Sequence, residues 1–112
     1  MVQIVDLESD PDFRALGVPL VSIAFDDPAT LARSATEFGI GDTPLLSDPD
    51  GAVSAAYDVL QWAAATGEPS HTFVLVGGDG DVAWVQDYGH PSNRGVMYVE
   101  PPEIVAEVAR RL

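Results

Sequence analysis

The sequence predicts an α/β fold in which helices cover a small mixed β-sheet in three layers. Three observations point to it. Asp-Pro pairs, which suit helix starts, occur three times; two segments are almost continuously apolar; and one later segment alternates between apolar and polar residues. Because 112 residues suffice for one modest core, we expect a single domain spanning residues 1–112.

The helix starts are marked by Asp10-Pro11, Asp27-Pro28 and Asp48-Pro49. In each pair the carboxylate can accept orphan backbone N–H groups, and the proline has no N–H to leave unpaired. The first helix is predicted from Pro11 to Leu16 before Gly17, the second from Pro28 to Gly39, the third from Pro49 to as far as Thr66, and a fourth after Pro101 and Pro102.

Apolar residues at helical spacing mark the faces that we expect to be buried. They are Leu31, Ala35 and Phe38 in the second helix, Val53, Ala56, Tyr57 and Leu60 in the third, and Ile104, Val105, Val108 and Leu112 in the last. In the last helix, Glu107 and Arg111 are also predicted to pair across four residues.

Strands are predicted between these helices. The segments 19–25 and 72–76 are nearly all apolar, which is typical of strands covered on both faces. The segment 82–88 alternates, as a half-exposed edge strand does, and the glycine-rich residues 77–81 suit a tight hairpin before it. The segment 90–102 is either a further edge strand or a lid over the sheet.

Composition excludes several classes of function. The chain has 18 acidic residues, five arginines and no lysine, and its net charge of −13 would repel nucleic acids and anionic membranes. It has no cysteine, so neither a disulfide nor a thiolate metal site is possible. No apolar run is long enough to span a bilayer and no signal peptide is recognisable. We expect a cytoplasmic location, no metal and no cofactor.

Several segments in order resemble one known family. PLLSDPDGAVSAAYDV from Pro44, SHTFVLV from Ser70, the Gly-Asp-Gly turn and an aromatic second strand are similar to the alkyl hydroperoxide reductase and thiol-specific antioxidant group, the peroxiredoxins of the thioredoxin-fold superfamily. The resemblance covers roughly residues 10–88. It implies a thioredoxin-like fold and, for the family, thiol-dependent peroxidase activity.

The residues that carry this family's chemistry are absent. The family attacks peroxide with a cysteine in a Pro-x-x-x-Thr-x-x-Cys loop, and the chain contains no such motif. The family's arginine, three residues before the Phe of the TFVLV strand, is replaced here by Ser70. The resemblance also makes Pro69 a candidate for a cis peptide bond, although it lies one residue before the usual position. We therefore predict no catalytic residue.

The resemblance also implies that the central strand of the sheet is missing. In a thioredoxin-like fold this strand lies between those predicted at 19–25 and 72–76, so the chain is expected to be N-terminally incomplete and to leave two apolar edges facing a gap. The segment 1–7 is either a replacement strand or, as we favour, the tail of a helix. A homodimer or another sheet-completing oligomer is the predicted remedy.

Five residues form the candidate binding site: Ser70, His71, Tyr88, His90 and Arg94. Arg94, the one arginine between Arg33 and the last helix, is either an anion anchor or, as we favour, part of a surface salt bridge. The two histidines match no compact metal motif, and Ser70-His71 lacks the elbow that a nucleophilic serine needs.

Two functions remain open. The first is a redox-inactive thioredoxin-like domain that serves as a binding or assembly module. The alternative is a fragment of a thiol-dependent peroxidase whose cysteine-bearing segment lies upstream.

Overall fold

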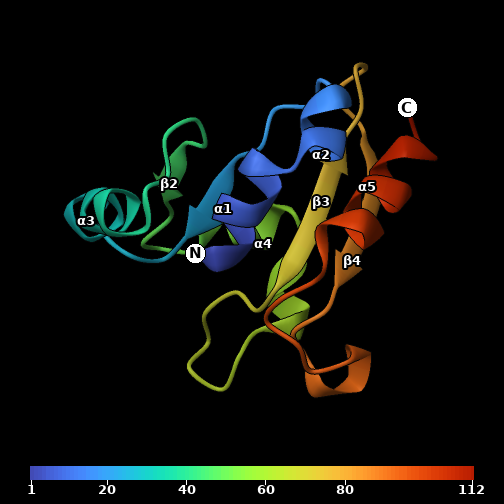
Figure 1. The fold of residues 1–112 in the computed structure, drawn as a ribbon. Helices are drawn as coiled ribbons and strands as arrows, with labels where there is room; N and C mark the ends of the chain where they lie inside the picture. Colours follow the sequence, from blue (N-terminus) through green and yellow to red (C-terminus); the bar gives the residue numbers. More distant parts are fainter.

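The computed structural model describes residues 1–112 as a mixture of helices and short strands (Figure 1). The helices are α1 (Val2–Ser9), α2 (Pro11–Ala15), α3 (Pro28–Phe38), α4 (Ala52–Ala56) and α5 (Pro101–Ala109), with 3₁₀ helices η1 (Val59–Trp62) and η2 (Pro91–Asn93). The strands are β1 (Ser22–Ala24), β2 (Leu45–Ser47), β3 (Thr72–Val76) and β4 (Val82–Asp87). The predicted α/β class is confirmed.

The strands form two separate two-stranded sheets (Figure 1). β1 pairs with β2 in parallel, and β3 pairs with β4 antiparallel. The single mixed sheet that the sequence predicts is therefore divided, and β1 and β3 are not hydrogen-bonded neighbours. The division falls where the central strand was predicted to be missing. In Figure 1, α1 lies between the two sheets in view.

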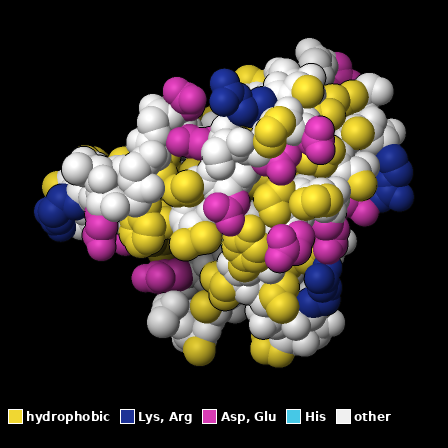
Figure 2. All heavy atoms as spheres, viewed as in Figure 1, with side chains coloured by type: hydrophobic (Ala, Val, Ile, Leu, Met, Phe, Trp, Pro, Cys, Tyr) yellow, Lys and Arg dark blue, Asp and Glu magenta, His cyan; other side chains and the backbone are white.

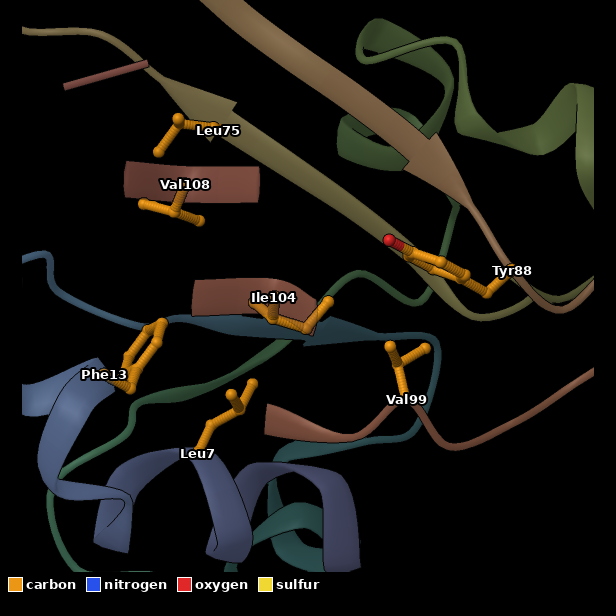
Figure 3. Close-up of a cluster of buried hydrophobic side chains, with 7 residues drawn as sticks. All are labelled: Leu7, Phe13, Leu75, Tyr88, Val99, Ile104 and Val108. Atoms are coloured by element: carbon orange, nitrogen blue, oxygen red, sulfur yellow. The ribbon is translucent and has the colours of Figure 1, made fainter. Parts of the chain in front are cut away.

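The main core packs α1, α2 and α5 against the β3–β4 sheet (Figure 3). Its seven buried residues are Leu7, Phe13, Leu75, Tyr88, Val99, Ile104 and Val108. The segment 1–7 belongs to α1, which confirms the helix tail in place of a replacement strand. Burying such side chains supplies most of the favourable free energy of folding.

Two of the predicted helix caps are confirmed. The carboxylate of Asp10 accepts from the Phe13 amide at 2.9 Å, and that of Asp27 accepts from the Thr30 amide at 2.7 Å. Each is followed by proline at the first helical position, as the Asp-Pro pairs predict.

The third predicted helix is shorter than expected. The carboxylate of Asp48 reaches past Pro49 to the amides of Val53 and Ser54, so α4 begins only at residue 52. Asp58 then adopts a left-handed conformation with φ 62°, which ends α4, and the chain continues as η1 to residue 62 and not to 66.

Several side chains that the sequence pattern places inside are exposed. Phe38 is 42% exposed, Val53 42%, Tyr57 39% and Leu112 69%. The apolar strand 19–25 shortens to β1, and it is not covered on both faces, because Val21 and Ile23 remain open to solvent. Tyr57 and Leu112 lie beyond the ends of α4 and α5, and Phe38 and Val53 lie on helix faces that no other element covers fully.

The segment 90–102 forms η2 and an extended strap with no strand. It is tied to the end of β4 by the Val96 amide, which donates to the Tyr88 carbonyl at 2.9 Å, and it buries Val99 in the core. The lid alternative is therefore the correct one. The chain has no cis peptide bond, so Pro69 is trans. No helix is long and apolar enough to cross a membrane.

Candidate functional site

The five predicted binding residues lie at one end of the β3–β4 sheet. Ser70 and His71 precede β3, Tyr88 follows β4, and His90 and Arg94 flank η2. Antiparallel pairing brings the start of one strand beside the end of the other. The sequence positions therefore meet in space, although the side chains do not converge on one point.

A backbone hydrogen bond links His71 to Tyr88, and a row of aromatic rings runs between their side chains. The Tyr88 amide donates to the His71 carbonyl at 2.8 Å. The Phe73 ring lies between them, 5.3 Å from the His71 ring and 5.8 Å from the Tyr88 ring, with edge-to-face geometry in both pairs. This row of rings is packed as a core, which leaves Tyr88 3% exposed.

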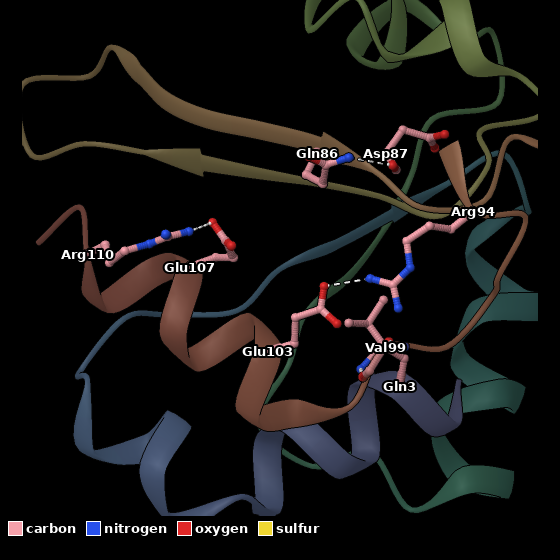
Figure 4. Close-up of polar contacts among 8 residues, drawn as sticks. All are labelled: Gln3, Gln86, Asp87, Arg94, Val99, Glu103, Glu107 and Arg110. Atoms are coloured by element: carbon pink, nitrogen blue, oxygen red, sulfur yellow. Dashed lines mark hydrogen bonds and ion pairs between the residues drawn. The ribbon is translucent and has the colours of Figure 1, made fainter. Parts of the chain in front are cut away.

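Arg94 is already paired. Its Nη1 lies 2.7 Å from Glu103 Oε2, and its guanidinium stands 5.4 Å from the centre of the Tyr88 ring (Figure 4). The Arg94 side chain is 52% exposed and that of Glu103 is 38% exposed, so this contact is a surface salt bridge with a cation–π contribution. The salt-bridge interpretation is confirmed.

His90 and Ser70 take part in local packing. His90 Nδ1 accepts from the Ser92 amide at 3.1 Å, which caps η2. Ser70 lies against Gly89, where an added Cβ would overlap Ser70 Oγ and lie 2.6 Å from the His71 amide nitrogen. Glycine is therefore required at position 89 by close approach of two chain segments.

Asp87 organises this end of the sheet and was missed by the sequence analysis. It is 1% exposed, and its carboxylate accepts from Thr72 Oγ1 at 2.8 Å, the His90 amide at 2.9 Å and Asn93 Nδ2 at 3.1 Å. Burial acts to raise the pKa of Asp87, but these hydrogen bonds outweigh it and hold that pKa below its usual value.

Gln3 is a second buried polar residue that no sequence pattern indicated. Its side chain donates from Nε2 to the Val99 carbonyl at 2.9 Å and accepts at Oε1 from the Val99 amide at 2.7 Å (Figure 4). The same Oε1 lies 2.9 Å from His71 Nε2. Burial is the main cause that lowers the pKa of His71, and the positive charge of the N-terminus adds to it. These contacts are structural, and every polar atom in them has a partner.

An unoccupied space lies between β1 and β3. A cavity of about 190 Å³ is lined by Ile23, Ala24, Phe25, Asp26, Glu68, Pro69 and Ser70. Its walls thus come from the end of β1 and from the segment that leads into β3. Because β1 ends at the cavity and β3 begins beside it, the two strands run in opposite directions.

The edge of β1 that faces away from β2 and the edge of β3 that faces away from β4 both carry unpaired backbone groups. In the β1–β2 ladder the Ser22 amide donates to Pro44 and the Ala24 carbonyl accepts from Asp48, so the backbone groups of Ile23 point away from β2. In β3 the same alternation directs the amides of residues 72, 74 and 76 away from β4. No other backbone hydrogen bond involves residues 72–76.

Apolar side chains accompany these open edges. Ile23 is 37% exposed and Val76 is 46% exposed, on strands whose composition is that of a sheet interior. Exposed apolar edge strands are rare in isolated proteins because they pair with other chains. The gap is therefore a second candidate site, bordered by unpaired strand edges with exposed apolar side chains. No group of three or more His, Cys, Asp or Glu side chains that could hold a metal ion is present.

The comparisons with known proteins identify the family. The model of the AhpC/TSA family matches residues 3–85, which is well over half of the chain. No curated protein and no solved structure gives a match. Together with the two half-sheets that face a gap, the match supports a peroxiredoxin-like arrangement of the thioredoxin fold without its central strand. The chain belongs to the AhpC/TSA family.

Proposed function

We propose that this chain is a redox-inactive member of the AhpC/TSA family that serves as a binding or assembly module. The observation that carries the proposal is the pair of unpaired strand edges, on β1 and β3, on either side of a cavity. An extended segment from another chain would receive main-chain hydrogen bonds from both edges and complete one continuous sheet. In this proposal residues 1–112 are a single thioredoxin-like domain whose sheet lacks the central strand.

The absence of cysteine supports the redox-inactive part of the proposal. The family's reaction requires a thiolate, and no side chain in this sequence supplies one. A peroxide consumption assay with a thiol reductant tests it directly. We expect no turnover above the buffer control, and turnover that scales with protein concentration would contradict the proposal.

Sheet completion has two sources within this proposal: a second copy in a homodimer, or a different protein. Sedimentation velocity at increasing protein concentration measures the first. A concentration-dependent shift from monomer to dimer supports the homodimer, and a strict monomer at high concentration excludes it. We also propose a cytoplasmic location, which fluorescence microscopy of the tagged full chain tests.

A second candidate function follows from the family match. In it, the sequence is one part of a thiol-dependent antioxidant peroxidase whose cysteine-bearing strand lies upstream and occupies the gap. Translating the DNA upstream of the codon for Met1 tests this candidate. An in-frame Pro-x-x-x-Thr-x-x-Cys or Cys-x-x-Cys would favour the peroxidase, and a stop codon or unrelated sequence would favour the binding module.

A further inference from the structure

The gap between β1 and β3 restricts which segment can enter it. β3 has five residues, so a strand that pairs along it needs about five residues, or roughly 17 Å. Since β1 and β3 run in opposite directions, the entering strand is parallel to one of them and antiparallel to the other. Only an extended segment without proline in its middle satisfies both edges.

Apolar side chains form part of the walls of the gap. Ile23 and Phe25 lie on the β1 side, and Pro69 lies on the opposite side. Phe25 is in turn backed by the α4–η1 region, because a Cβ at Gly51 would lie 3.0 Å from the Phe25 ring and 3.7 Å from Leu60. A strand placed in the middle of a sheet with elements on both faces buries both of its own faces, so the entering segment must be apolar at successive positions.

The cavity at one end of the gap is acidic. Asp26 and Glu68 line it, no arginine does, and neither carboxylate takes part in an ion pair. The net charge of −13 adds to the negative potential. Figure 2 shows acidic side chains in magenta spread among hydrophobic atoms on one face of the molecule, with arginine in a few separate places. A basic residue at the end of the entering strand would be attracted there.

A second copy of this chain does not supply such a segment. Its own apolar strands are followed by Asp26-Asp27 and by Gly77-Gly78-Asp79, and no arginine adjoins them. The apolar residues 96–99 do follow Arg94, but they are held within their own fold, because the Val96 amide donates to the Tyr88 carbonyl and Val99 is buried in the core. Each copy also carries a net charge of −13, which opposes self-association. Both observations disfavour a second copy as the occupant of the gap.

From this complementarity we infer that the partner is a different protein, which inserts an extended apolar segment of about five residues bordered by arginine or lysine between β1 and β3. The inference rests on the proposed function and specifies its partner. Main-chain hydrogen bonds to the two open edges give affinity, and the contact with Asp26 and Glu68 gives selectivity for a basic border.

Fluorescence anisotropy with labelled synthetic peptides tests the inference. The probe is Arg-Val-Ile-Val-Ile-Val-Arg, which carries arginine at both ends so that it serves either strand direction. Its twin has glutamate at both ends. A third peptide is methylated at alternate amide nitrogens, which removes main-chain donors. We expect the arginine peptide to bind at least roughly fivefold more tightly than the glutamate peptide, with a preference that declines as salt is added.

Two double variants test whether Asp26 and Glu68 cause the preference for the arginine peptide. Asp26→Asn with Glu68→Gln should reduce the preference for arginine to below roughly twofold. The matched control, Asp12→Asn with Glu37→Gln, removes the same charge from exposed positions outside the cavity and should retain the preference. Loss of the preference in both variants would show a general charge effect and would overturn the inference.

The outcomes separate this inference from the proposed function. If the arginine and glutamate peptides bind equally and the methylated peptide binds more weakly, the inference that the partner has a basic border is overturned. The proposal that the gap binds an extended strand is then retained. Binding of no peptide by a chain that sediments as a dimer overturns the inference and supports the homodimer. Binding of no peptide by a strict monomer contradicts both.

Discussion

Truncation of Gln3 to alanine should destabilise the protein strongly. Gln3 is 6% exposed and makes two hydrogen bonds to the backbone of Val99, which is 1% exposed. The variant Gln3→Ala leaves a buried amide and a buried carbonyl without partners. Each such group costs about 1–3 kcal/mol, so the free energy of unfolding should fall by roughly 2–6 kcal/mol. This is a large fraction of the total stability of about 5–15 kcal/mol that a domain has.

Urea denaturation monitored by tryptophan fluorescence measures this loss. With an m-value of about 1–3 kcal/mol/M, the midpoint should fall by roughly 1–3 M urea. The matched control is Gln61→Ala, because Gln61 is exposed and its hydrogen bond to the Asp58 carbonyl closes only a local turn. The control should change stability by less than about 0.5 kcal/mol.

A second substitution separates hydrogen bonding from packing. Gln3→Met keeps most of the side-chain volume and removes both bonds to Val99, so it should cost nearly as much as Gln3→Ala. If Gln3→Met is as stable as the wild type, the reasoning from buried backbone groups is refuted, and the loss in Gln3→Ala has to be assigned to the cavity alone.

Three further variants are predicted to change stability. Gly89→Ala forces a Cβ to within 2.6 Å of the His71 amide nitrogen, and urea denaturation should show a loss of about 1–3 kcal/mol or more. His71→Gln should reduce the dependence of stability on pH. The pKa of His71 is lowered in the folded state, so below a pH of about 6.5 the unfolded chain binds a proton that the folded chain does not. The stability of the wild type should therefore fall as the pH drops below about 6.5, and that of the variant should fall less. Glu8→Gln should cost about 1–3 kcal/mol and weaken the attachment of the 41–43 loop, because the carboxylate of Glu8 accepts hydrogen bonds from all three amides of that loop.

Each of these has its own check. Gly78→Ala, where an added Cβ meets nothing within 4 Å, should be close to neutral, so an equal loss at both glycines would contradict the contact argument. A wild-type stability that stays flat between pH 7.5 and 5.5 would contradict the assignment to His71. For Glu8, hydrogen exchange of the Thr43 amide should accelerate, and unchanged exchange would show that its contact with Glu8 at 3.0 Å is dispensable.

Sequence patterns predicted the structure correctly where a residue contacts only residues close to it in the chain. The caps formed by Asp10 and Asp27 follow from the sequence, because a carboxylate and a proline at a helix start act within one turn. Asp48 carries the same signal but reaches further, since Gly51 takes a left-handed conformation with φ 72° and delays the helix. β2 was missed because three residues give too short a pattern to recognise.

Burial and the site depend on contacts between distant residues. Gln3 and Val99 are 96 positions apart, and a single polar residue in a short helix gives no sign that it will be buried. Phe38 and Ile23 show the reverse error: periodicity predicts that a face is apolar, not that anything covers it. The resemblance to a known family, in contrast, anticipated the gap, because it indicated which strand the sheet would lack.

Hydrogen exchange of individual strand amides is the most direct test of the open sheet edges. In the free chain, the amides of Ile23 and Val74 should exchange rapidly because they face the gap, while those of Phe73 and Leu75 should be protected by β4. Addition of the arginine-bordered peptide should slow Ile23 and Val74 by at least roughly tenfold. Strong protection of Ile23 and Val74 in the free monomer, or no change when peptide is bound, would contradict the account.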